Sequence, residues 1–193
     1  MNRRTTVLLA LPLALMGGCS ATTAGTPTAD SSATSTPTAS SEAQHVTNPL
    51  DPTPYLSKPC DLVPQQLTAQ LGVTQPKPDM SLGSFCGWIS ETDDKTLTVS
   101  IPTLTNGKNG GIAAVYKARD AGGYRFADPT EVSGYPAAFA DTTDRRAQGK
   151  CTVYVGISDG VVFAAGVDGF RGQEDSCGAA QQVAAAVIAT LEG

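Results

Sequence analysis

Hydrophobic residues after about residue 48 recur at two different spacings, and these spacings predict helices and strands. Near the C-terminus they recur every three or four positions, which is typical of a helix with one buried face. The residues concerned are Ala180, Val183, Ala184, Val187, Ile188 and Leu191. We expect Asp175 or Ser176 to cap this helix at its N-terminus, so that Cys177 lies in the first turn.

Two shorter helices are predicted earlier in the chain. Residues 64–71 begin with Pro64, which suits a first helical turn, and are followed by Gly72, which suits the position after a helix end. Residues 112–120 place Ile112, Val115 and Tyr116 on one face. The glycine-rich residues 106–111 before this second helix lack the spacing of a phosphate-binding loop, so we interpret them as a turn.

Alternation of apolar and polar residues predicts strands elsewhere. Residues 85–90 and 95–101 form a predicted hairpin joined by a polar turn, and residues 151–157 and 161–167 form a second one. The second hairpin turns at Ser158-Asp159-Gly160, where Asp-Gly suits a positive φ. Further strands are predicted at 124–126 and 135–140, separated from the second hairpin by the exposed segment 141–150. In that segment we interpret Asp144, Arg145, Arg146 and Lys150 as a solvated face.

The order of these elements predicts the fold class. Helices and antiparallel strands alternate in a way that favours an α+β domain, with about five to six strands in one sheet and about three helices covering it.

The N-terminal residues form a different pattern, that of a secretory leader. Arg3 and Arg4 precede an apolar run over residues 7–16, which ends in Gly17, Gly18 and Cys19. The apolar run is shorter than the roughly 20 residues that a membrane-spanning helix needs. A cysteine directly after small residues is typical of a lipoprotein signal, so we expect residues 1–18 to be removed and Cys19 to be lipidated. The alternative is an ordinary cleaved signal whose first mature residue is cysteine.

A tether separates this leader from the domain. Residues 19–48 are rich in Ser, Thr, Ala and Pro, and a segment of this composition cannot bury enough apolar surface to fold. We therefore expect a disordered tether over 19–48 and a globular α+β domain over 49–193. His45, the single histidine, falls in the tether, where we interpret it as a solvated bystander.

The five cysteines become an even set once Cys19 is assigned to lipid. An exported protein meets an oxidising environment, so the other four are expected to form two disulfides. Four cysteines allow three pairings, and we favour Cys60–Cys86 with Cys151–Cys177 because these close the smaller loops. Trp88 lies two residues after Cys86 and is expected to pack near the first disulfide. No Cys-x-x-Cys spacing is present, which makes a metal site a weak alternative.

Charge excludes one class of partner. The formal net charge is −5 at pH 7, and removing the leader with Arg3 and Arg4 makes it two units more negative. Nucleic-acid binding depends on Lys and Arg that neutralise phosphate, so we expect no nucleic-acid partner.

Six short motifs are distributed along the chain after the lipoprotein signal and tether. They are Cys60-Asp61-Leu62-Val63, Leu71-Gly72, Cys86-Gly87-Trp88, Gly134-Tyr135-Pro136-Ala137, Cys151-Thr152-Val153 and Cys177-Gly178-Ala179-Ala180. Together they resemble a family of actinobacterial lipoproteins catalogued as domain of unknown function 3558. Lys58-Pro59-Cys60 stands where that family usually has Asp-Pro-Cys. The resemblance implies export, lipid anchoring and two disulfides, and it supplies no active site.

Candidate catalytic groups are few. The domain 49–193 has no histidine to act as a base. Ser57 and Lys58, a possible nucleophile and base, are neighbours in a predicted loop, where we expect both to be solvated. The carboxylate pairs Asp93-Asp94 and Glu174-Asp175 fall in a turn and at a helix start, where acidic residues are expected for structural reasons. Residues that could line a ligand pocket are Tyr116, Tyr124, Phe126 and Tyr135, although core packing explains each of them as well.

These observations favour a non-enzymatic binding or interaction module, anchored through Cys19 to the extracytoplasmic face of the cell membrane. We expect no metal and no cofactor. Its partner is expected to be an unknown envelope protein or a small apolar ligand. Two alternatives are a cell-wall-active, glycosidase-like enzyme that uses carboxylates alone, and a purely structural envelope lipoprotein.

Overall fold

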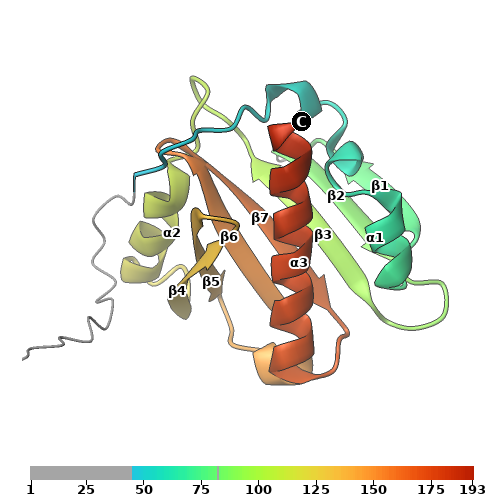
Figure 1. The fold of residues 1–193 in the computed structure, drawn as a ribbon. Coiled ribbons are helices and arrows are strands. Elements are labelled where there is room, and N and C mark those ends of the chain that lie inside the picture. The colour runs from blue at the N-terminus through green and yellow to red at the C-terminus, as the bar shows by residue number, and fades with distance from the viewer. Residues whose placement is uncertain (1–44, 82) are drawn as a thin grey trace, which may run out of the picture. The chain divides into compact units, whose positions relative to one another are not determined.

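The computed structural model describes residues 45–81 and 83–193, and these form an α+β domain (Figure 1). Cys19, the predicted leader and most of the predicted tether lie outside the described residues. The strands are β1 (Gln75–Asp79), β2 (Gly83–Ile89), β3 (Thr96–Pro102), β4 (Phe126–Val132), β5 (Tyr135–Asp141), β6 (Cys151–Ser158) and β7 (Val161–Asp168). The helices are α1 (Gln65–Gln70), α2 (Gly111–Asp120) and α3 (Gly172–Glu192), with short 3₁₀ segments η1 (Thr53–Tyr55), η2 (Pro59–Leu62) and η3 (Arg146–Gln148).

All seven strands belong to one antiparallel sheet with the order β1-β2-β3-β7-β6-β5-β4. The fold class is therefore confirmed, with slightly more strands than expected. β3 and β7 pair across the middle, with Thr96 opposite Asp168. This register brings the turn before β3 and the loop after β7 to the same end of the sheet.

The two faces of the sheet carry separate apolar clusters. Alternate residues of β2, β3, β6 and β7 pack with α3, η2 and Leu67 of α1 in the larger core. The side chains of Ala138, Ala140 and Val162 point to the other face and pack against α2. Figure 1 shows α3 running along the sheet beside α1, with α2 near β4 and β5. Among the described residues, no helix combines the length and apolarity needed to cross a membrane.

Both disulfides form with the expected pairing. Cys60–Cys86 joins η2 to β2, Cys151–Cys177 joins β6 to α3, and the Cα atoms of each pair are 5.1 Å apart. Each bridge therefore attaches a helical segment to a strand of the sheet. Trp88 is buried on the same face of β2 as Cys86, in accordance with the alternation of that strand.

The expected start of the last helix is wrong. α3 begins at Gly172, so Asp175 and Ser176 lie within its first two turns and neither caps it. Ser176 Oγ instead donates a hydrogen bond to the backbone oxygen of Gln173. Cys177 consequently lies in the second turn. Gly172, with φ +71°, is the first residue of the helix, which therefore starts earlier than the capping residues suggested.

The sheet also departs from the predicted strand boundaries. β1 was not expected, and β4 spans Phe126–Val132 rather than residues 124–126. At the β6–β7 turn, neither Asp159 nor Gly160 has a positive φ. A Cβ on Gly160 would lie 2.8 Å from Cγ of Lys108, so a larger residue there would displace the Lys108 side chain.

Residues 45 and 46, at the end of the predicted tether, contact the domain. Val46 is 5% exposed, packs in the larger core, and donates its N–H to Asp159 Oδ1 at 2.8 Å. His45 Nδ1 lies 2.9 Å from Asp159 Oδ2, although the imidazole is largely exposed. The Asp159 carboxylate thus holds two consecutive residues where the described chain enters the fold.

Candidate functional site

A cleft of about 670 Å³ lies on the α3 face of the sheet, and we call it the α1–α3 cleft. Its lining comes from α1, the β2–β3 turn, the β7–α3 loop and α3, which can be located in Figure 1. The lining residues are Gln70, Leu71, Asp93, Lys95, Gly169, Phe170, Arg171, Glu174, Asp175, Gly178, Ala179 and Gln182. These segments are far apart in the sequence, and the β3–β7 pairing brings two of them together.

One wall of the cleft is a stripe along α3. Glu174, Gly178 and Gln182 follow one another at helical spacing, with Asp175 and Ala179 beside them. Gly178 is exposed, and a Cβ placed on it would meet no atom within 4 Å. The middle of this wall is therefore open, while its two ends differ in chemistry: carboxylates at one and an amide at the other.

Phe170 forms the apolar part of the loop wall. Its N–H donates to the backbone oxygen of Gly149 at 3.2 Å, and Lys95 Nζ lies 5.9 Å from the centre of its ring. The neighbouring Gly169 has φ +81°, and a Cβ there would lie 2.6 Å from the backbone oxygen of Asp94. The loop after β7 is thus packed directly against the β2–β3 turn, which fixes the position of Phe170 in the cleft.

Asp93 and Lys95 form an ion pair at the edge of the cleft, with 2.8 Å between Nζ and Oδ2. The hydrogen bond from Lys95 is the largest of the effects that lower the pKa of Asp93 to about 2, followed by a hydrogen bond from Ser90. Asp93 is therefore ionised at neutral pH, and its charge is matched by that of Lys95.

The remaining charges lie at the start of α3. Arg171 Nε is 3.7 Å from Asp175 Oδ2, and the Arg171 side chain is almost fully exposed. Within the described part of the chain Glu174 has no ion-pair partner. The cleft thus contains two cations, each beside a carboxylate, and one further carboxylate.

Some of the predicted candidates meet in this cleft and others lie elsewhere. Asp93, Glu174 and Asp175 line it, whereas Asp94 does not. Lys58 pairs instead with Asp61 and lies 5.5 Å from the ring centre of Tyr55. Phe170 was not among the predicted residues, because an aromatic residue just after a strand carries no distinctive pattern in the sequence.

None of the four aromatic residues proposed for a pocket lines the α1–α3 cleft. Tyr116 and Tyr135 are buried, and the Tyr135 hydroxyl donates to the backbone oxygen of Asn48. The Tyr124 hydroxyl donates to that of Tyr154 at 2.9 Å. Burial is the largest of the effects that raise the pKa of Tyr154. These residues pack against the sheet or against one another.

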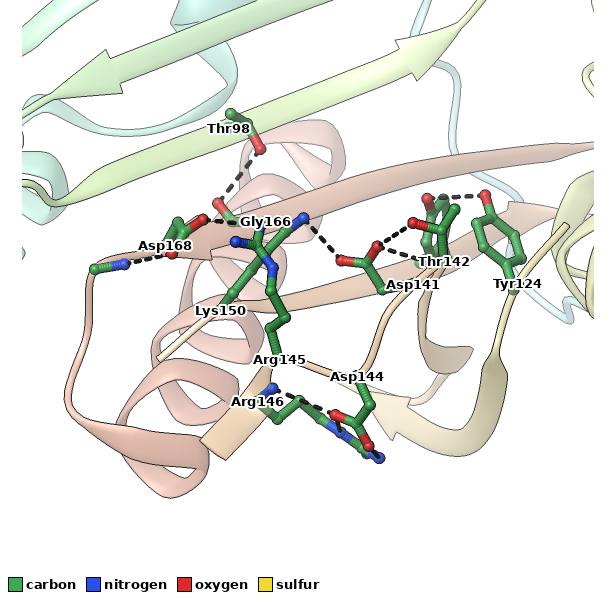
Figure 2. A network of polar contacts seen from close by, with 12 residues as sticks. Thr98, Tyr124, Asp141, Thr142, Asp144, Arg145, Arg146, Lys150, Gly166 and Asp168 are labelled. Carbon is green, nitrogen blue, oxygen red and sulfur yellow. Dashed lines mark hydrogen bonds and ion pairs between the residues drawn. The ribbon is translucent and has the colours of Figure 1, made fainter. Parts of the chain in front are cut away.

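A separate polar network surrounds residues 141–150 (Figure 2). Lys150 Nζ is 3.0 Å from Asp141 Oδ2, and Arg145 reaches Asp168 at 3.4 Å. A small hollow of about 270 Å³ adjoins this network beside Thr98 and Gly166. Because the charges in the network are paired with one another, we assign it a structural role.

The expectation of a solvated face in this segment is wrong for Arg146 and Lys150. Their side chains are 15% and 28% exposed. Arg146 binds Asp144 and Asp128, each at 2.7 Å, and its guanidinium lies 4.0 Å from the ring centre of Phe126. These contacts attach η3 to β4, because the Arg146 guanidinium is held on the ring of one β4 residue and on the carboxylate of another.

One comparison with known proteins agrees with the motif pattern. A family model described as "Protein of unknown function (DUF3558)" matches residues 14–190, which is nearly the whole chain. Searches of curated proteins and of solved structures found no significant match. The chain therefore belongs to the DUF3558 family of proteins of unknown function.

Proposed function

We propose that this protein is a non-enzymatic binding module, anchored by lipid on Cys19 to the extracytoplasmic face of the cell membrane, and that the α1–α3 cleft is its binding site. The observation that carries the binding role is the cleft itself. It combines charges of both signs, one aromatic wall and an open position at Gly178. A concave surface with a few converging polar groups is typical of ligand sites.

The proposed location depends on the leader and the disulfides. Arg3, Arg4 and the apolar run before Cys19 have the order of a lipoprotein signal. Two disulfides in a domain of this size support an oxidising compartment. A lipid on Cys19 would hold the domain at the membrane through the tether predicted over residues 19–48.

The carboxylate-only enzyme receives less support. Such a glycosidase needs one carboxyl group with a raised pKa to act as the general acid. Every described carboxyl group whose pKa departs from its ordinary value shifts downward, including Asp93 in the cleft. We therefore place binding ahead of catalysis.

The test is site-specific photo-crosslinking in intact cells. A photo-reactive amino acid replaces Gln182, which lines the cleft, or Ala189, which is exposed farther along α3 and serves as the control position. We expect a defined adduct, identified by mass spectrometry of bound lipids and proteins, from position 182 and none from position 189.

A second substitution closes the cleft in the same experiment. Gly178→Trp places a large side chain in the open space on α3, whereas Gly178→Ala leaves that space largely open. The adduct from position 182 should disappear with tryptophan and persist with alanine. Persistence with tryptophan, or equal adducts from both photo-reactive positions, would show that the cleft is not the binding site.

A further inference from the structure

We propose that the α1–α3 cleft binds a short, extended peptide segment that carries a free amino group, a step that rests on the proposed function. Three properties of the cleft point to this class of ligand: its length along α3, its excess negative charge at the start of α3, and the two exposed side-chain amides in its lining.

The length of the lined stripe fits a few peptide residues. Residues 174 to 182 of α3 span about 12 Å, at about 1.5 Å per residue. An extended peptide advances by about 3.3 Å per residue, so three to four residues match this distance. The open position at Gly178 lies in the middle of the stripe and leaves room for the peptide backbone to approach the helix.

The charges favour a cation at the start of α3. Lys95 and Arg171 each lie beside a carboxylate, at 2.8 Å and 3.7 Å. The Glu174 carboxylate is the charge in the cleft without such a neighbour among the described residues. An ammonium group beside Glu174 would bring the sum of formal charges in the cleft to zero, whereas a ligand carboxylate or phosphate would make that sum more negative.

Two side-chain amides in the lining of the cleft suit a peptide backbone. Gln70 from α1 and Gln182 from α3 are both exposed and line the same space. A side-chain amide donates and accepts hydrogen bonds, which matches the N–H and C=O groups of an extended peptide. Leu71 and Ala179 provide an apolar surface for small side chains.

Three synthetic peptides test this inference on the mature chain in detergent micelles. They are tetra-alanine amide with a free amino terminus, the same amide with an acetylated amino terminus, and acetyl-tetra-alanine with a free carboxylate. Binding is followed by NMR through the backbone amide shifts of Phe170 and Gly178. We expect the free amine to bind about twofold to fivefold more tightly than the acetylated amide, as for an exposed ion pair, and the carboxylate to bind most weakly.

A charge substitution identifies the residue responsible. In Glu174→Gln the advantage of the free amine should vanish, whereas in Asp94→Asn, which removes a carboxylate outside the cleft, the advantage should remain. Equal affinity of the three peptides, an advantage that survives Glu174→Gln, or no binding of any peptide would overturn the inference. If the Gln182 crosslink is still blocked by Gly178→Trp in that case, the cleft remains the binding site and the peptide class alone is wrong.

Discussion

Gly149 and Phe170 are packed so closely that residue 149 has no room for a side chain. A Cβ on Gly149 would overlap the backbone oxygen of Phe170, and Gly149 has φ +88°. The Phe170 N–H also donates to the Gly149 oxygen at 3.2 Å. The aromatic wall of the cleft is therefore held by a glycine 21 positions earlier, at the end of η3.

Gly149→Ala should destabilise the protein by about 3 kcal/mol or more, because it adds both backbone strain and a clash with the β7–α3 loop. Gly134→Ala is the matched control. Gly134 has φ +82°, nearly the same as Gly149, but a Cβ there meets no atom within 4 Å. The free energy of unfolding of this control should fall by about 1 kcal/mol, from backbone strain alone. Urea unfolding measures both variants, and equal losses would contradict the packing described here.

Removal of either disulfide should cost about 3.5 kcal/mol by the chain-entropy relation, because both bridges close loops of the same length. The paired cysteines are 26 residues apart in each case. The variants are Cys60→Ala with Cys86→Ala, and Cys151→Ala with Cys177→Ala, compared by urea unfolding. Peptide mapping without reduction should recover these two pairs from the wild-type protein, and a peptide linking Cys60 to Cys151 would refute the topology.

The Asp93–Lys95 pair should contribute stability that depends on pH. The pKa of Asp93 in the folded state is lowered from 3.8 to about 2, chiefly by its hydrogen bond from Lys95. The contribution is therefore complete above pH 3.8 and is lost as the pH falls to about 2. An NMR titration of the Asp93 carboxyl group should show a midpoint near 2, and Lys95→Met should raise it.

The Lys95→Met midpoint should remain below 3.8 because the hydrogen bond from Ser90 persists. Lys117→Met removes an exposed lysine on α2 and should leave the Asp93 midpoint unchanged. An Asp93 midpoint that is the same in the wild type and in Lys95→Met would rule out the pair as the cause.

Cys19→Ala should release the protein from the membrane, because no thiol remains to receive the lipid. The variant is expected in the culture supernatant or as an uncleaved precursor, and it should leave the detergent phase in a partitioning assay. Cys19→Ser provides a second test with a side chain closer in size to cysteine. Unchanged partitioning of both variants would refute lipidation.

The strongest patterns in the sequence predicted their elements well. α3 buries a continuous apolar stripe and β6 buries alternate residues over most of its length, as their patterns predict, whereas residues 161–167 of β7 are all buried. β1 was not predicted, because all five of its residues are exposed and two of them are prolines, Pro76 and Pro78. Without a buried face, a strand shows no alternation in the sequence.

The cleft could be predicted in its parts and not as a whole. Asp93 and Glu174 were recognisable as carboxylates in a turn and at a helix start, but they are 81 positions apart. Their meeting depends on the pairing of Thr96 with Asp168, which joins two hairpins that are separated by α2 and two strands. Local sequence patterns contain no information on such a register.

The prolines at both edges of the sheet limit pairing between the edge strands of neighbouring copies. Pro76 and Pro78 lie in β1, Pro129 lies in β4, and these two strands form the outer edges. A proline in an edge strand lacks the N–H that another strand would need for pairing. On the lipid-anchored protein proposed here, many copies would share one surface, where exposed strands could join sheet to sheet into aggregates. The interrupted edges would keep neighbouring copies separate at that density.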